Sequence, residues 1–501
     1  GLVGSEMCIR DRRYIMNKIS CFLPYAGKEQ VEKTVNSLQA TGLIEEIRLI
    51  TTDATLESLP DCEILFVDMP YSSATLKAIA NAAKGEYTLL YTKETTLEMG
   101  MFALERMIHI LEDSSAGMVY ADHYQIADGK QSNAPVIDYQ FGSLRDDFNF
   151  GSLLLFNTEK LKEAAGHMKS DYNFAGLYDL RLKLSQHSNL VHINEYLYSE
   201  VENDTRKSGE KIFDYVDPKN RDRQIEMEQA CTEHLKEIGG YLAPEFKKIE
   251  FSAGNFEYEA SVIIPVRNRI RTIRDAIKSV LMQKTDFKYN LIIIDNHSTD
   301  GTTEAIDEFK DDERLIHIVP ERNDLGIGGC WNVGVHHPKC GKFAVQLDSD
   351  DVYKDENTLA IMVRAFYEQN CAMVVGTYMM TDFNMNMIAP GIIDHKEWTP
   401  ANGRNNALRI NGLGAPRAFY TPVLREVKVP NTSYGEDYAL GLNFSRQYQI
   451  GRVYDVVYLC RRWDDNSDAS LDIVKMNGHN LYKDRIRTWE LQARIAMNKN
   501  K

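Results

Sequence analysis

Short apolar runs alternate with amphipathic segments along most of the chain. In the second half, the run at 260–265 predicts a buried strand, and apolar residues spaced three and four apart from 273 to 281 predict a helix after it. Strands alternating with helices of this length predict an α/β fold with a mostly parallel sheet. Further strands are expected at 290–295, 315–319 and 342–347, and further helices from about 302 to 310 and at 326–336.

The first half repeats this order of elements. Residues 19–24 match the first strand, and 46–50 match the second. Tyr87 lies 256 residues before Phe343, Met118 lies 256 before Val374, and residues 178–184 parallel 438–444 at an offset of 260. An ordered set of such matches predicts two tandem copies of one domain.

The expected organisation has five parts. Residues 1–15 are expected to be a non-native leader, because no sustained apolar core follows their basic residues. A degenerate copy of the domain is expected at 16–240, with an exposed helix near 221–238, and a linker at 241–255. The catalytic copy is expected at 256–473, and a basic helix at 474–501.

Charge and composition exclude several classes of protein. The 501 residues include 73 acidic and 58 basic side chains, and the net charge of −15 repels nucleic acid. No stretch approaches the roughly 18 consecutive apolar residues of a transmembrane helix. The eight cysteines are scattered without a CxxC pair, which favours reduced thiols and a cytoplasmic location.

Charged and polar residues follow the predicted strands of the second half. Arg267 and Asn268 follow the first strand, Asp295 ends the second, and three carboxylates lie at 348–351 after the fourth. Ligands bind at the carboxyl ends of such strands, and three adjacent carboxylates repel one another unless a cation joins them. Mg²⁺ or Mn²⁺ suits such oxygen ligands. The alternative is an acidic turn that caps the helix expected near residue 355.

Five motifs in the second half together resemble the family 2 glycosyltransferases of the GT-A fold. Their order and spacing cover nearly all of 259–465. The resemblance implies that a sugar moves from a nucleotide diphosphate donor to an acceptor hydroxyl with inversion at the anomeric carbon. The motifs are SVIIPVRN at 261–268, IIIDNHSTDGT at 292–302, NDLG at 323–326 with NVG at 332–334, LDSDD at 347–351 and GEDY at 435–438.

The resemblance also implies roles for individual residues. Asp437, with Glu436 beside it, matches the catalytic base, although its place before Leu440 also fits an ordinary first turn of a helix. Asp348, Asp350 and Asp351 match the metal-binding DxD motif, which implies Mn²⁺ or Mg²⁺ on the diphosphate. The residues expected to bind the donor are Pro265, Val266, Arg267, Asn268, Asp295, Asn296, Asn323, Gly326, Asn332, Asp348, Ser349, Arg461 and Arg462.

Three positions depart from the family pattern. Asn296 stands where many members carry a second acid, and Trp331 stands where a basic residue commonly precedes Asn332. Residues 461–463, Arg-Arg-Trp, are similar to the QxxRW element of processive synthases, but Leu459 occupies the glutamine position. We therefore expect a non-processive enzyme. Asp295 has a second interpretation, as a cap of the helix that follows it.

The first half lacks the corresponding acids. Thr92-Lys-Glu94 stands at the DxD place, Leu177 stands at the place of the base, and Thr51 falls near the place of Asp295. These losses predict a non-catalytic domain for docking or acceptor binding. The alternative is a second metal site built from Glu94 or from residues 122–123.

The C-terminal segment carries seven Lys or Arg residues, with Ile486, Trp489, Ala493 and Met497 on one helical face. We favour a helix packed on its own domain over one that lies on anionic lipid beside a lipid-linked acceptor. The overall prediction is a cytoplasmic enzyme of polysaccharide or glycoconjugate synthesis, with the inner membrane face as a second location. There are two alternative functions. The first is an NDP-sugar nucleotidyltransferase, but such an enzyme requires a glycine-rich loop after the first strand, and residues 266–270 contain no glycine. The second is a non-catalytic carbohydrate-binding or scaffold protein.

Overall fold

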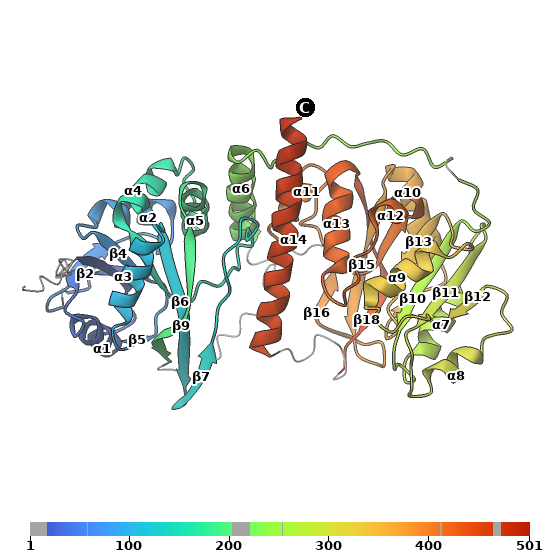
Figure 1. Cartoon of the computed structure of the whole chain (residues 1–501), viewed down its shortest axis with the longest axis horizontal. Coiled ribbons are helices and arrows are strands. Elements are labelled where there is room, and N and C mark those ends of the chain that lie inside the picture. Colours follow the sequence, from blue (N-terminus) through green and yellow to red (C-terminus); the bar gives the residue numbers. More distant parts are fainter. Residues whose placement is uncertain are drawn as a thin grey trace, which may run out of the picture. The chain divides into compact units, whose positions relative to one another are not determined.

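The chain folds as two compact units (Figure 1). The computed structural model describes residues 18–57, 59–202, 221–252, 254–410, 413–463 and 472–500. Unit 1 contains the described residues up to Phe141, then 146–202 and 221–234. Unit 2 contains Gly142–Arg145 and the described residues from Leu235 onward.

Unit 1 is built on a nine-stranded sheet with the order β3-β2-β1-β4-β8-β6-β9-β5, and β7 pairs with β6. Strands β3, β2, β1 and β4 are parallel to one another. The strands are β1 (Ile19–Pro24), β2 (Ile44–Thr51), β3 (Glu63–Phe66), β4 (Tyr87–Tyr91), β5 (Thr96–Met99), β6 (Met118–Ala127), β7 (Lys130–Ala134), β8 (Leu153–Asn157) and β9 (Leu190–Val201). The helices are α1 (Lys28–Gln39), α2 (Ser73–Ala82), α3 (Ala103–Asp113), α4 (Thr158–His167), α5 (Gly176–His187) and α6 (Arg221–Glu237).

Unit 2 has the same strand order, β12-β11-β10-β13-β17-β15-β18-β14, with β16 paired to β15. The predicted α/β class and the tandem duplication are therefore confirmed. The strands are β10 (Ala260–Val266), β11 (Tyr289–Asp295), β12 (Leu315–Ile318), β13 (Phe343–Gln346), β14 (Val352–Tyr353), β15 (Met373–Thr381), β16 (Met387–Ile393), β17 (Arg417–Tyr420) and β18 (Ile450–Arg461). The helices are α7 (Ile273–Leu281), α8 (Thr302–Asp307), α9 (Ile327–His336), α10 (Thr358–Gln369), α11 (Gly403–Asn406), α12 (Thr421–Val427), α13 (Glu436–Gln447) and α14 (Ile473–Lys499).

Strand register relates the two units residue by residue. Tyr87 pairs with the first residue of β1, as Phe343 pairs with the first residue of β10. Helices α5 and α13, and strands β9 and β18, correspond at an offset of 260. Met118 stands opposite the first residue of β9 and Met373 opposite that of β18, so the predicted match of Met118 with Val374 is wrong by one residue. The start of β15 follows the start of β13 by one residue less than the start of β6 follows that of β4, because β13 is one residue shorter than β4.

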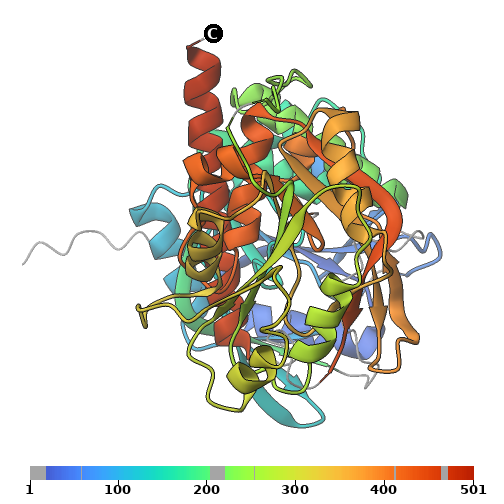
Figure 2. The same ribbon diagram turned by 90° about the vertical axis from the view of Figure 1, so that its right-hand side faces the viewer.

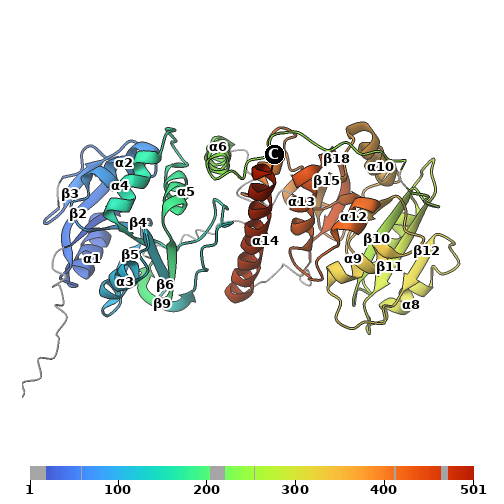
Figure 3. The same cartoon turned by 45° about the horizontal axis from the view of Figure 1, so that its top comes forward.

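Helices cover both faces of the second sheet. Helix α9 packs on β10 and β11 and contacts α12 and α13, and Figure 3 shows these three helices on one side of the strands. Helices α7 and α10 pack on β14, β15 and β18 from the other side. The strands between the layers are apolar along their length, and Ile263, Ile292 and Val345 are fully buried. This burial is the main hydrophobic stabilisation of the unit.

Helix α6 is only partly as expected. It forms where a helix is predicted, but Met227, Ala230 and Cys231 are buried, so the prediction of an exposed helix is wrong for this face. These residues recur at three- and four-residue spacing, which places them on one side of the helix. The polar residues that dominate its composition occupy the other sides.

Helix α14 packs against α13 within unit 2, and Figure 2 shows it along its length. The predicted apolar face is wrong at Trp489, which is 56% exposed. The buried stripe instead runs through Asp484, Arg487, Leu491 and Arg494. Buried charges require partners, and α14 supplies some of them itself, since Asp484 pairs with Arg487 and Glu490 with Arg494. In the part of the chain that the structure describes, no helix is both long and apolar enough to cross a membrane.

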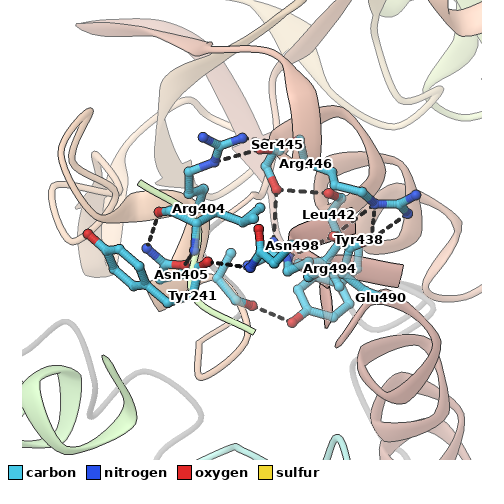
Figure 4. Close-up of polar contacts among 12 residues, drawn as sticks. Tyr241, Arg404, Asn405, Tyr438, Leu442, Ser445, Arg446, Glu490, Arg494 and Asn498 are labelled. Carbon is cyan, nitrogen blue, oxygen red and sulfur yellow. Dashed lines mark hydrogen bonds and ion pairs between the residues drawn. The ribbon is translucent and has the colours of Figure 1, made fainter. Parts of the chain in front are cut away.

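A polar network holds this helix in place (Figure 4). Glu490 accepts hydrogen bonds from Arg494 of its own helix at 2.7 Å and from Arg446 of α13 at 2.6 Å. Near the C-terminal end, Asn498 donates to the carbonyls of Gly239 and Tyr241. Because Glu490 and Arg494 are buried, these bonds are charge-assisted and shielded from water.

Candidate active site

Three strand ends of unit 2 meet at one edge of its sheet. Strands β10, β11 and β13 are parallel, with Val266 in register with Asp295, and the turn 348–351 begins two residues after β13. Pro265 lies just before this edge as a half-buried residue of β10. The sequence predictions for the donor pocket and the acidic turn therefore fall at the same edge of the sheet.

Asp295 is fully buried at the end of β11. Its carboxylate accepts hydrogen bonds from the Ser298 backbone at 3.0 Å and from the Thr303 hydroxyl at 2.5 Å, and His317 lies 3.5 Å away. Burial raises the pKa of Asp295, but the hydrogen bonds from His317, Ser298 and Thr303 outweigh it and hold the pKa well below its usual range. Asp295 therefore stays ionised and organises the turn after β11. It does not cap the following helix, because the N-cap of α8 is Gly301.

The loop after β10 is fixed against this turn. Asn268 has a left-handed backbone with φ 53°. Its backbone N–H donates to Ser298, and its side chain accepts from the backbone of Thr299 at 2.8 Å. Asn296 donates to the Leu325 carbonyl at 2.9 Å, and Arg267 is exposed. The loop is thus rigid in its backbone, with Arg267 exposed to solvent.

The acidic turn is enclosed by strands. Asp348 accepts from Gln346 at 2.9 Å, and Tyr458 of β18 donates to Asp351 at 2.8 Å. The backbone N–H of Arg461 donates to the other oxygen of Asp351. Burial is the main cause that raises the pKa of Asp348 and of Asp351, and the charge of Asp350 raises both further. Burial and mutual repulsion therefore disfavour the simultaneous ionisation of these acids unless a cation joins them.

Cationic and aromatic side chains surround Asp350. Its carboxylate lies 3.7 Å from the Arg269 guanidinium, which also lies over the ring of Trp463. Arg271 lies 4.4 Å from the centroid of Phe383 and 5.3 Å from that of Trp463. This edge of the turn accordingly combines positive charge with flat apolar surface, both of which suit an anionic nucleotide.

Arg461 has a positioning role. It is buried, its guanidinium donates to the carbonyl of Asp350 at 2.6 Å, and it pairs with Asp275 at 2.8 Å. The predicted contact of Arg461 with a diphosphate therefore competes with two bonds of its guanidinium, one to the acidic turn and one to α7. The backbone of Arg462 donates to Thr381, and Ser349 is buried with its carbonyl bonded to Thr272.

The two acids of α13 stand at the start of that helix. Asp437 pairs with Arg417 of β17 at 2.8 Å. The charge of Arg417 also acts on Asp348 and Glu436, so this cation links the acidic turn to α13. Burial, followed by the charge of Asp437, raises the pKa of Glu436 to about 7. A carboxylate with that pKa is suited to proton transfer near neutral pH.

Two predicted donor residues, Asn332 and Gly326, contact a different loop. Asn332 uses both ends of its amide on the backbone of Val429, at 2.7 and 3.0 Å. The backbone of Gly326 donates to Asn431, and the exposed Asn323 lies three residues before it. Trp331 is buried edge-on against Phe419. Asn332 and Gly326 thus hold the loop before α13, and Trp331 belongs to the core.

The carboxylates of Asp348 and Asp350 fit a divalent cation, because they supply hard oxygen donors and excess negative charge. Asp351 is less suited, since both of its oxygens are engaged by β18. Among the described residues, no group of three His, Cys, Asp or Glu side chains is arranged to hold a metal ion by itself. A cation here would need further oxygen ligands, such as those of a phosphate.

The corresponding place in unit 1 has different chemistry. Lys93 pairs with the buried Glu200 of β9 at 2.8 Å, and His123 lies 3.2 Å from the same carboxylate. Glu94 is exposed, and Asp122 pairs with His192 at 2.8 Å. The alternative of a metal site at Glu94 or 122–123 receives no support, because no metal-binding group occurs among the described residues.

Gln346, Arg417 and Tyr458 complete the site without belonging to any predicted set. Arg417 and Gln346 carry no signal in the sequence, because their partners are reached across the sheet. Tyr458 has one detectable signal, since Tyr198 occupies the corresponding position 260 residues earlier.

Comparison with known proteins matches these motifs to a family. Residues 261–418 match the model of glycosyl transferase family 2. An uncharacterized glycosyltransferase of Rickettsia felis is 37% identical over 198 residues, covering 39% of this chain and 31% of that protein. TuaG of Bacillus subtilis, a putative teichuronic acid biosynthesis glycosyltransferase, is 29% identical over 126 residues, covering 25% and 49%. The chain thus spans less than half the length of these relatives.

Two solved structures are also similar. TarS 1–349 of S. aureus, in complex with UDP-GlcNAc, has a TM-score of 0.38 and 19% identity, covering 48% of this chain and 72% of that one. Glucosyl-3-phosphoglycerate synthase of Mycobacterium tuberculosis, in complex with Mn²⁺, UDP and glucosyl-3-phosphoglycerate, has a TM-score of 0.32 and 17% identity, covering 48% and 81%. The family match and the named relatives thus make residues 261–418 of this chain similar to glycosyl transferase family 2.

Proposed function

We propose that unit 2 is an inverting glycosyltransferase of GT-A type, which moves a sugar from a nucleotide diphosphate donor to an acceptor hydroxyl. The observation that carries this proposal is the link through Arg417. This residue pairs with Asp437 and also acts on Asp348, so it brings the acids of α13 into one electrostatic unit with the acidic turn. The family match supports the same reaction class.

The proposed chemistry is a single in-line displacement. The acceptor oxygen forms a bond to the anomeric carbon, while the bond from that carbon to the donor phosphate breaks. The nucleotide diphosphate leaves with the bonding electrons, and the acceptor proton passes to a carboxylate of α13. Asp437 is the proposed base, and Glu436 beside it, with its pKa raised to about 7, is a second acceptor for the proton.

Asp348 and Asp350 would hold Mn²⁺ or Mg²⁺ as a DxD motif. A bound divalent cation would stabilise the negative charge that develops on the leaving diphosphate. Arg269 and Arg271 lie on the same side of the turn and would bind phosphate oxygens directly. The exposed Arg267 would add positive charge at the end of β10.

We propose that unit 1 is non-catalytic. At the place of the acidic turn it has Lys93 paired with Glu200, and its helix α5 has Leu177 where α13 has Asp437. An ammonium group beside a buried carboxylate already neutralises the charge that a metal would otherwise meet.

The name of the Bacillus subtilis relative favours an acceptor in a cell-surface polysaccharide.

The test is a binding and turnover screen of UDP-, GDP- and dTDP-sugars with Mn²⁺, using the full chain. We expect one nucleotide sugar to bind and to release its nucleoside diphosphate. Asp350→Ala should abolish donor binding, whereas Asp437→Asn should retain binding and stop transfer. Release of pyrophosphate from a nucleoside triphosphate and a sugar phosphate would instead identify a nucleotidyltransferase. Lys93→Ala is the matched control variant in unit 1, and this variant should transfer the sugar normally.

A further inference from the structure

A pocket of about 360 Å³ lies in unit 2 beside the N-terminus of α13. It is lined by Thr432, Ser433 and Tyr434 of the loop before that helix, and by His479 and Tyr482 of α14. All five residues lie outside the matched range 261–418. The family match therefore assigns this pocket no role.

The aromatic walls of the pocket are fixed by direct contacts. The rings of Tyr434 and His479 are stacked, with centroids 3.6 Å apart and planes at 12°. The Lys483 ammonium lies 4.6 Å from the Tyr434 centroid, in a cation–π contact with that ring. A Cβ on Gly435 would lie 3.3 Å from the Tyr482 ring, so this ring packs on the backbone directly before Glu436.

The loop that supplies the other wall is equally well held. The hydroxyl of Thr432 donates to the Tyr434 carbonyl at 3.0 Å. The backbone of Gly328 donates to the carbonyl of Thr432 at 2.9 Å, which ties the loop to α9. Gly435 then turns the chain into α13 with a φ of 78°, a conformation that favours glycine.

Buried ion pairs fix α14 relative to α13. Besides the Glu490 pairs drawn in Figure 4, Arg487 donates to the Tyr438 hydroxyl at 2.8 Å and pairs with Asp484 at 2.9 Å. Tyr438 follows Asp437 directly, so the same bonds position the pocket-lining helix against the two acids. The pocket walls are thus pre-organised, which lowers the entropy cost of binding.

We propose that this pocket binds a sugar ring of the acceptor, and that α14 thereby sets acceptor specificity. The proposal rests on the proposed function of unit 2. One face of the Tyr434 ring is covered by His479, so the Tyr482 ring is the one that offers an apolar face to the C–H surface of a sugar. The hydroxyls of Ser433 and the two tyrosines offer hydrogen bonds to its polar edge. Consecutive Cα atoms are about 3.8 Å apart, so Tyr434 lies within about 8 Å of Glu436. The pocket therefore adjoins the first turn of α13, which carries the two acids, although neither acid is among its lining residues.

The experiment uses saturation-transfer NMR on the full chain, with UDP and Mn²⁺ present. The probes are the methyl glycosides of glucose, galactose and N-acetylglucosamine. We expect at least one glycoside to bind, and Tyr482→Ala to weaken its binding about ten-fold, as loss of an aromatic contact in a pocket warrants. Trp489→Ala is the matched control, because it removes an exposed aromatic residue from the same helix outside the pocket and should leave the affinity unchanged.

The outcomes separate this inference from the proposed function. UDP affinity is measured on the same samples, and a chain that binds no nucleotide refutes the proposed function itself. Intact UDP binding without saturation transfer to any glycoside, or with equal transfer in Tyr482→Ala and the wild type, refutes the sugar pocket. Binding of vesicles containing phosphatidylglycerol that depends on Tyr482, without glycoside binding, would assign the pocket to a lipid headgroup instead and would also overturn the proposal.

Discussion

The ion pair between Arg417 and Asp437 offers the sharpest test of how unit 2 is assembled. Arg417→Met removes the cation and retains a side chain of similar length. Two unit charges 2.8 Å apart attract by about 6 kcal/mol at an effective dielectric constant of 20. The side chain of Asp437 is 33% exposed and that of Arg417 is 12% exposed, so solvent screening and desolvation offset much of this attraction. We expect a coupling free energy of about 2 kcal/mol.

The assay is urea unfolding followed by tryptophan fluorescence. All four tryptophans, at 331, 398, 463 and 489, belong to unit 2, so their signal reports this unit alone. A double-mutant cycle with Asp437→Asn isolates the coupling from other effects of each substitution. Arg274→Met is the control, because it breaks an exposed pair with Glu308 and should leave the free energy of unfolding nearly unchanged.

The functional consequence follows from the same geometry. Without Arg417, three acids at 348, 436 and 437 lose their shared cation, so repulsion should displace the proposed base. Transfer should therefore fall more than nucleotide binding does. A coupling below about 0.5 kcal/mol, or transfer that is unchanged in Arg417→Met, would show that this residue does not organise the site.

Three further predictions concern stability. The pKa of Glu436 is raised in the folded state, so its contribution to stability is present below the unfolded pKa and is lost as pH rises through about 7. Glu436→Gln should therefore stabilise unit 2 by about 2 kcal/mol at pH 8 and by little at pH 4. Urea titrations at the two pH values measure this difference. Leu491→Ala, at a fully buried position of α14, should cost about 3 kcal/mol by tryptophan fluorescence, and a cost near zero would mean that α14 does not pack as described. Lys93→Met should leave Glu200 buried without its ammonium partner and lower the free energy of unfolding of unit 1 by about 2 kcal/mol. This figure is already reduced for solvent screening, because Lys93 is 47% exposed. Hydrogen exchange of the β9 amides measures the loss, and unchanged protection would contradict the prediction.

Much of the fold is predictable because it depends on local patterns. The run at 260–265 and its successors form the expected strands, because continuous apolar residues are what a doubly covered sheet requires. The offset of 260 between α5 and α13 is also visible in the sequence, since both helices keep the same length. The match at Met118 fails by one residue because apolar strand residues are interchangeable in sequence, and only hydrogen-bond register identifies the partner.

Features that depend on contacts across the fold are not predictable in this way. Trp489 fits an apolar stripe, yet α14 buries Asp484 and Arg494 instead, because these charges also bond to Ser143 and Ser445 outside the helix. Asn332 belongs to a motif expected to bind the nucleotide-sugar donor, yet both ends of its side-chain amide form hydrogen bonds with the backbone of Val429. The location of acids at strand ends can be read from sequence, whereas the cation that joins them, Arg417, cannot.

The duplication shows how one fold supports two electrostatic designs. Tyr458 and Tyr198 correspond in sequence and both lie buried on the last long strand of their units. In unit 2 the Tyr458 hydroxyl donates to a turn of carboxylates, whereas in unit 1 the Tyr198 hydroxyl accepts from the backbone of Ser152 at 2.9 Å. Because the tyrosine is retained while its partners differ, it serves the packing of both sheets. The chemistry lies in the turn after the fourth strand, where Lys93 supplies in unit 1 a positive charge that the carboxylates of unit 2 would have to obtain from a bound cation.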